Sequence, residues 1–147
     1  IARDEIAEAF LIRRALESES AAQAATRMTQ SHADRLEDIL LLHARALERK
    51  KYVEAIERDD DFHRYIADIS NLPRLWRAIE ISKAQLDRCR HMMLPREGEA
   101  ETTLEKHRVI ITALKSGNPE TAARAMRDHL ETAYRSTVAV LDGPGLN

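Results

Sequence analysis

Apolar residues recur along this chain at intervals of three and four, the spacing that places them on one face of an α-helix. Two of the clearest stripes are Leu36, Ile39, Leu40 and Leu47, and then Leu104, Ile110, Ile111 and Leu114. No segment has the composition and the alternating pattern of a half-buried β-strand. The pattern predicts an all-α fold of about six helices, and the short connections between them favour an antiparallel bundle.

Gly, Pro and Asn residues between the stripes predict where the helices begin and end. The first helix is expected from about Arg3 to Met28. Ser31 is the predicted N-cap of the second helix, with Asp34 in a capping-box position. The third helix is expected from Tyr52 to about Asn71, and the fourth begins at Pro73 with Asn71 as its cap. The fifth lies between the turn at 95–98 and Gly117. The sixth begins at Pro119, is capped by Asn118 and reaches about Leu141.

The composition argues against several functions. The 147 residues fit one domain, and 23 basic against 25 acidic side chains give a net charge of −2, so the chain has no basic field that would attract DNA. Its single cysteine cannot form an internal disulfide, and no apolar run is long enough to cross a membrane. We expect a cytoplasmic protein with no membrane partner and no direct contact with DNA.

The two ends of the chain lead to separate expectations. The sequence begins at Ile1 rather than at a methionine, so we expect a fragment of a longer protein with a segment missing upstream. Gly143, Pro144 and Gly145 oppose helix formation after the sixth predicted helix. We therefore expect one helical domain over residues 1–142 and a flexible tail over residues 143–147.

Four titratable side chains lie on the apolar faces of the predicted helices. Asp59 and His63 are four residues apart and share a face of the third helix, while His107 and His129 lie in the stripes of the fifth and sixth. A buried carboxylate is costly unless it is compensated, and a divalent metal bound by one carboxylate and three neutral imidazoles supplies that compensation. For each residue taken alone, core packing or an ion pair with an arginine is the favoured interpretation, but the four together predict a metal site.

The carboxylate ligand and the ion are chosen by position and by chemistry. Asp61 points to the opposite side of the third helix and Asp60 lies at the edge of its stripe, so Asp59 is the better ligand. Imidazole combined with carboxylate suits zinc, nickel, iron or manganese. We expect zinc or nickel, with manganese or iron as alternatives.

Three further residues, Arg13, Arg88 and His43, are candidates for binding an effector beside this site. Arg13 lies with Glu17 in the apolar sector of the first helix, where it either forms an intrahelical ion pair or grips a ligand carboxylate. Arg88 and Arg90 on the fourth helix can bind a carboxylate in the same way or remain solvated. His43 lies in an apolar stripe with no acidic partner one turn away, so it is interpreted as packing or cavity lining.

Several short motifs, taken in order, resemble a known family. The motifs are Ile12 to Glu17, reading IRRALE, then Asp59 to His63, reading DDDFH, then Asn71, then Glu105 to His107, and finally Met126 to Leu130 after Gly117. In order and spacing they resemble the C-terminal ligand-binding domain of the FadR subfamily of GntR-type bacterial transcription regulators. The resemblance covers nearly the whole chain.

This resemblance implies an effector-binding and dimerisation domain that follows a winged helix-turn-helix DNA-binding domain, which is absent from this chain. Metal-containing members bind a divalent ion through one Asp and three His, and the matching positions here are Asp59, His63, His107 and His129. The implied partners are a small organic acid as effector, a second copy of the chain, and DNA only through the missing domain.

A metal-dependent hydrolase is the alternative function, because a metal at such a site can activate water. The sequence contains neither HExxH nor the paired Glu-x-x-His motifs of di-iron bundles, and it offers no general base apart from the predicted ligands. We therefore expect no enzymatic activity. A purely structural helical module is a third interpretation, which predicts no stoichiometric metal.

Overall fold

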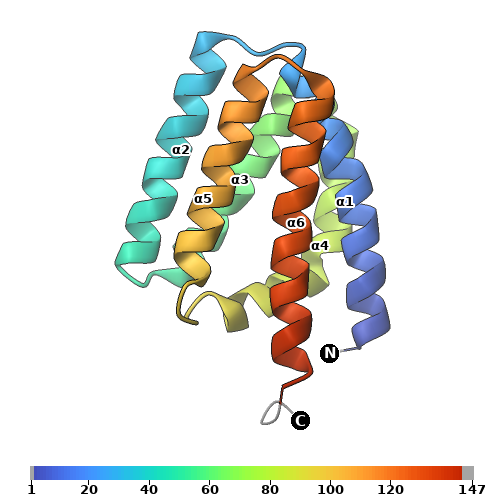
Figure 1. Ribbon diagram of the computed structural model, residues 1–147, viewed down its shortest axis with the longest axis vertical. Coiled ribbons are helices and arrows are strands. Elements are labelled where there is room, and N and C mark those ends of the chain that lie inside the picture. The colour runs from blue at the N-terminus through green and yellow to red at the C-terminus, as the bar shows by residue number, and fades with distance from the viewer. Residues whose placement is uncertain (1, 144–147) are drawn as a thin grey trace.

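The computed structural model describes residues 2–143 and confirms the all-α prediction. Its six helices are α1 Arg3–Ala25, α2 Gln30–Glu48, α3 Tyr52–Ser70, α4 Pro73–Met93, α5 Glu99–Lys115 and α6 Pro119–Leu141. Consecutive helices run in opposite directions, so the start of α1 and the end of α6 lie at the same end of the bundle (Figure 1). Residues 144–147 of the expected flexible tail lie outside the described part. No helix within residues 2–143 is long and apolar enough to cross a membrane.

The start of α2 differs from the prediction that Ser31 and Asp34 would cap it. Thr29 is the N-cap: its side-chain oxygen accepts a hydrogen bond from the His32 amide at 3.2 Å, and the His32 ring accepts one from the Thr29 amide at 3.2 Å. This arrangement is a capping box that begins two residues earlier than expected, with an imidazole in the place of the usual carboxylate or amide side chain. The prediction of Ser31 as the cap was therefore wrong.

Two other boundaries also shift. The first helix ends at Ala25, three residues before the predicted Met28. Asn71 was predicted to cap the start of α4, but it ends α3 instead, in the left-handed conformation with φ 60° that asparagine tolerates better than most residues. Leu72 is the N-cap of α4, and Pro73 occupies its first turn as predicted.

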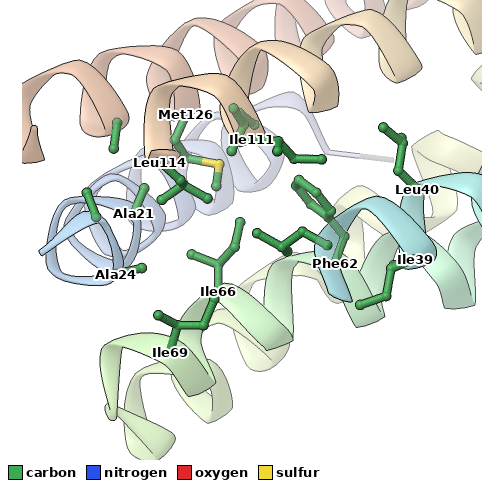
Figure 2. Packing of buried hydrophobic residues seen from close by; sticks show 14 of the residues in the cluster. Ala21, Ala24, Ile39, Leu40, Phe62, Ile66, Ile69, Ile111, Leu114 and Met126 are labelled. Atoms are coloured by element: carbon green, nitrogen blue, oxygen red, sulfur yellow. The ribbon is translucent and has the colours of Figure 1, made fainter. Parts of the chain in front are cut away.

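The main apolar core lies between α1, α2, α3, α5 and α6. Phe62 and Ile66 of α3 are fully buried and lie opposite Leu114 and Met126 of the last two helices, as Figure 2 shows. The fourth helix packs mainly against α1 and α3, through a smaller cluster that includes Trp76. The bundle therefore surrounds its centre with five helices and closes one side with α4.

We predict that Leu36→Ala in α2 lowers the free energy of unfolding by about 2–5 kcal/mol, because Leu36 is fully buried in the main core and its truncation leaves a cavity. Leu41 of the same helix is 61% exposed, so Leu41→Ala should change it by no more than about 0.5 kcal/mol. Urea unfolding of both variants measures the difference. Equal losses would contradict the assignment of these two faces of α2.

Candidate metal centre

The structure brings the four predicted metal ligands together in the middle of the bundle. Asp59 and His63 come from adjacent turns of α3, His107 comes from α5 and His129 from α6, and all four are buried. One donor atom from each lies within 4.8 Å of the others. Metal–nitrogen and metal–oxygen bonds of about 2.0–2.2 Å bring such donors within reach of one ion after small adjustments.

The polar atoms of this cluster fit a metal ion better than they fit one another. The Nε2 atoms of His63 and His107 lie 3.5 and 3.1 Å from the same oxygen, Oδ1 of Asp59. Both nitrogens are nevertheless buried and lack a well-aligned hydrogen-bond partner within the described chain. Buried polar atoms that converge without satisfying one another are costly, and a shared divalent ion would satisfy them together. The cluster is therefore compatible with a metal ion.

The protonation states favour ligand chemistry at two of the imidazoles. Burial lowers the pKa of His107. Burial, together with the neighbouring rings of His107 and His63, holds the pKa of His129 well below its ordinary value. Burial alone would raise the pKa of Asp59, but Arg90 and His63 outweigh it and hold that pKa well below the ordinary value. The site therefore offers two neutral imidazoles and an ionised carboxylate at neutral pH.

Glu17 of α1 positions His63 from the far side of the ring. Its Oε1 lies 2.6 Å from His63 Nδ1, while its other oxygen accepts a hydrogen bond from Arg13. Burial alone would raise the pKa of Glu17, but Arg13 and His63 lower it to about 2. Burial would likewise lower the pKa of His63, but Glu17 and Asp59 raise it to about 9. A carboxylate behind a ligand histidine fixes the ring and directs its other nitrogen to the metal.

Arg90 of α4 holds the second oxygen of Asp59. Its guanidinium lies 2.5 Å from Asp59 Oδ2 and 3.9 Å from Asp87. This ion pair leaves Asp59 Oδ1 directed at the imidazoles of His63 and His107. Arg90 therefore neutralises the buried carboxylate and links α4 to the centre of the bundle.

The neighbouring aspartates are engaged elsewhere, which agrees with the choice of Asp59. Asp60 forms a 2.8 Å ion pair with the buried Lys83 of α4, and Asp61 pairs with Arg58 and Arg64 of its own helix. Neither carboxylate belongs to the cluster of converging donors.

A cavity of about 70 Å³ adjoins the cluster, between α1, α4 and α6. Its polar lining includes Arg13, Arg90, Asp59 and His129, and the rest is largely apolar, including Ile6, Phe10, Leu86, Leu130 and Tyr134. Two guanidiniums beside a candidate metal site can bind an anionic group in bidentate fashion. The cavity is thus suited to a small molecule with a carboxylate at one end.

The three predicted effector residues fall in different places. Arg13 forms the predicted ion pair with Glu17 and also lines the cavity, so its binding of a ligand carboxylate stays a prediction. His43 is fully buried and does not line the cavity. The centroid of its ring lies 5.3 Å from that of His107. Arg88 is exposed and also lies outside the lining, whereas Arg90 is part of it.

Sequence reasoning missed the specific contacts of Glu17 and Arg90. Glu17 was placed on the inner face of the first helix but paired only with Arg13, and Arg90 was treated together with Arg88. For Glu17, the available signal was its position in an apolar sector of the first helix, four residues after Arg13. For Arg90 the signal was its place two residues beyond Arg88, on the other side of α4.

The chain is thus an all-helical bundle with a buried Asp and three His beside a small cavity. Residues 8–132 match the FCD domain family. The chain belongs to this family, whose members are the C-terminal effector domains of FadR-subfamily GntR regulators.

Individual relatives agree with this assignment. The chain is 33% identical over 136 residues to the HTH-type transcriptional repressor RspR of Escherichia coli and to the HTH-type transcriptional regulator YdfH of Shigella flexneri, covering 92% of this chain and 60% of each relative. The fold matches that of E. coli McbR/YncC with a TM-score of 0.86 at 19% identity, over 97% of this chain and 68% of that one. The names of these relatives in sequence describe helix-turn-helix transcription regulators, which agrees with the expectation of a regulator domain rather than a hydrolase.

We predict that Glu17→Gln lowers metal affinity about 10- to 100-fold, because the variant keeps the side-chain shape but removes the charge that orients His63. Glu19→Gln changes an exposed carboxylate of the same helix and should have no effect. Competition with a metallochromic chelator measures both affinities. Equal affinities in the two variants would show that Glu17 does not position the ligand.

Proposed function

We propose that this chain senses a small organic acid, using a divalent metal ion and two arginines to hold the acid's carboxylate in the cavity. One observation carries the proposal: Asp59 and His129 belong to the cluster of metal donors and also line the cavity. An ion at this cluster supplies a positive docking point for an anion. Zinc or nickel suits the donor set best, with manganese or iron as alternatives.

The size of the cavity limits the effector. A volume of about 70 Å³ compares with about 10–15 Å³ for one water, which leaves room for roughly five to seven water-sized groups. Phe10 and Tyr134 pack against each other in its wall, with ring centroids 4.3 Å apart. The effector class is therefore a short acid with a compact, partly apolar body rather than a long-chain acid.

Arg90 connects the effector to the fold. It pairs with Asp59 of α3, and α4 makes its main contacts with α1 and α3. A carboxylate bound beside Arg90 competes with Asp59 for the guanidinium and so changes the interaction that holds α4 against the site. Such a ligand shifts a conformational equilibrium only by its difference in affinity for the two states. We infer that α4 is the element whose position reports the bound acid.

The chain spans about 60% of the length of its relatives RspR and YdfH, whose names describe helix-turn-helix regulators. We infer that it works beside an upstream winged helix-turn-helix domain, as a homodimer, and in the cytoplasm where the regulated DNA lies. DNA contact would then come through that domain, because this chain has a net charge of −2.

We predict that the metal-loaded chain binds short carboxylic acids saturably and that His107→Ala removes both bound metal and acid affinity, because His107 is a buried donor of the cluster. His91 is exposed on α4, and His91→Ala should preserve both. Calorimetric titration with a panel of two- to six-carbon acids, before and after chelation, measures the effect. Unchanged metal content and acid affinity in His107→Ala would refute the proposal.

We predict that Arg90→Gln weakens acid binding about 10- to 100-fold, since a hydrogen bond to a charged group contributes about 1.5–3 kcal/mol. Arg88→Gln, two residues away on the exposed side of α4, should leave acid affinity unchanged. The same titration compares the two variants, with metal content measured in each. If Arg88→Gln were the one to lose acid affinity, the effector would lie elsewhere.

A further inference from the structure

The centre of the bundle holds one more imidazole, which neither the donor cluster nor the cavity uses. His43 of α2 is fully buried, and both of its ring nitrogens lack a hydrogen-bond partner within residues 2–143. Burying an unpaired polar ring is costly, and a leucine or phenylalanine would suit the apolar stripe of α2 better. The position of His43 therefore calls for a polar partner.

His107 of α5 is close enough to be that partner. The centres of the two rings are 5.3 Å apart, and their planes are inclined by 52°. A hydrogen bond between two ring nitrogens spans roughly 3 Å, and the radii of the two rings account for the remaining distance. A modest rotation of either side chain therefore aligns an N–H of one ring with the lone pair of the other.

The atom of His107 that is available for this contact is Nδ1. Its other nitrogen, Nε2, lies 3.1 Å from Oδ1 of Asp59, on the side of the donor cluster. Nδ1 is buried and has no hydrogen-bond partner in the described part of the chain. A neutral imidazole that binds an ion through Nε2 carries its proton on Nδ1, and this N–H needs an acceptor.

The other aromatic neighbours of His107 are unsuited to accept this proton. Phe62 stacks on the face of the ring, with ring centres 4.2 Å apart, and has no lone pair to offer. His63 and His129 lie edge-on, with ring centres 5.3 and 4.8 Å away, and both belong to the donor cluster. Among these neighbours, His43 is thus the imidazole outside the donor cluster.

His43 differs in charge from Glu17, which contacts Nδ1 of His63 in the same way. Burial, together with the neighbouring His107, lowers the pKa of His43 to about 3, so its ring is neutral. A neutral imidazole has one N–H and one lone pair. It can accept a hydrogen bond from His107 when an ion occupies Nε2, and it can donate one when Nε2 carries the proton. The two rings can therefore stay hydrogen-bonded with and without metal.

We propose that His43 is a positioning residue for the metal site, forming a hydrogen bond with Nδ1 of His107 and so directing Nε2 of His107 to the ion. This contact joins α2 to the site, as Glu17 joins α1 and Arg90 joins α4. The inference rests on the proposed metal site but not on the proposed effector, because His43 lies outside the cavity lining.

The first test separates a hydrogen-bonding role from a packing role. His43→Leu removes both ring nitrogens but keeps a branched apolar side chain, and Leu47→Met is a volume-conserving control at a buried position of the same helix. We expect His43→Leu to lower zinc affinity about 10- to 100-fold, and Leu47→Met to leave it unchanged. Competition with a chelator measures the affinities, and urea unfolding of the metal-free chains measures stability. If His43 only packed, His43→Leu would bind zinc as tightly as the parent.

Two amide variants guard against a general loss of structure. The side-chain oxygen of Asn lies near the place of Nδ1 in His, and that of Gln lies near the place of Nε2. One of His43→Asn and His43→Gln should therefore return an acceptor to His107 and recover most of the lost zinc affinity. Circular dichroism checks that both fold. Failure of both folded variants to recover affinity would overturn the proposal.

Nuclear magnetic resonance of protein with isotopically labelled histidine nitrogen detects the contact directly. A coupling across an N–H···N hydrogen bond should join His43 to Nδ1 of His107 in the metal-free and zinc-loaded parent and disappear in His43→Leu. Absence of this coupling from both forms would contradict the pairing. A parent that binds no zinc would refute the metal proposal and this role with it. A parent that binds zinc no more tightly than His43→Leu would overturn the role of His43 alone.

Discussion

The rest of the structure depends on the compensation of one fully buried carboxylate, that of Asp59. A carboxylate in a helical core is stable only if charges and donors of other elements surround it. Here α4 provides Arg90, α5 provides His107, and the adjacent turn of α3 provides His63. Four of the six helices, counting α6 with His129, therefore meet at this residue or beside it. The order of the helices in the bundle is thus tied to the site, and the fold and the site stabilise each other.

The polar network extends outward from Asp59 in two directions with different consequences. Toward α1, Glu17 and Arg13 form a buried chain that fixes His63, so this side holds the ligand geometry. Toward α4, Arg90 lies in the cavity wall and holds Asp59 by an ion pair that an incoming carboxylate can share. Removing one partner from a buried pair is far more costly than exchanging it for another anion. The contacts toward α1 are therefore suited to holding His63 in place, and the contact toward α4 is suited to changing when an acid binds.

The sequence alone predicted the helices, the four converging residues and the family, since each depends on local spacing. A period of three to four residues identifies the faces, and placing Asp59, His63, His107 and His129 on those faces is enough to direct them inward. The contacts between helices were not predictable in the same way. The bond from Glu17 to His63 and the choice of Arg90 over Arg88 depend on how α1 and α4 rotate against α3, which helical periodicity does not specify. Thr29 was missed as a cap because its partner is an imidazole rather than the usual carboxylate.

The most direct test of the central claim is the metal content of the purified chain, measured by elemental analysis in parallel with the double variant Asp59→Ala, His63→Ala. Both proteins are first incubated with zinc, nickel or manganese and then freed of loosely bound ions. The account predicts close to one divalent ion per chain in the parent and none in the double variant, since both residues belong to the converging donor set. No metal in either protein would contradict it and would reduce the four residues to buried polar packing.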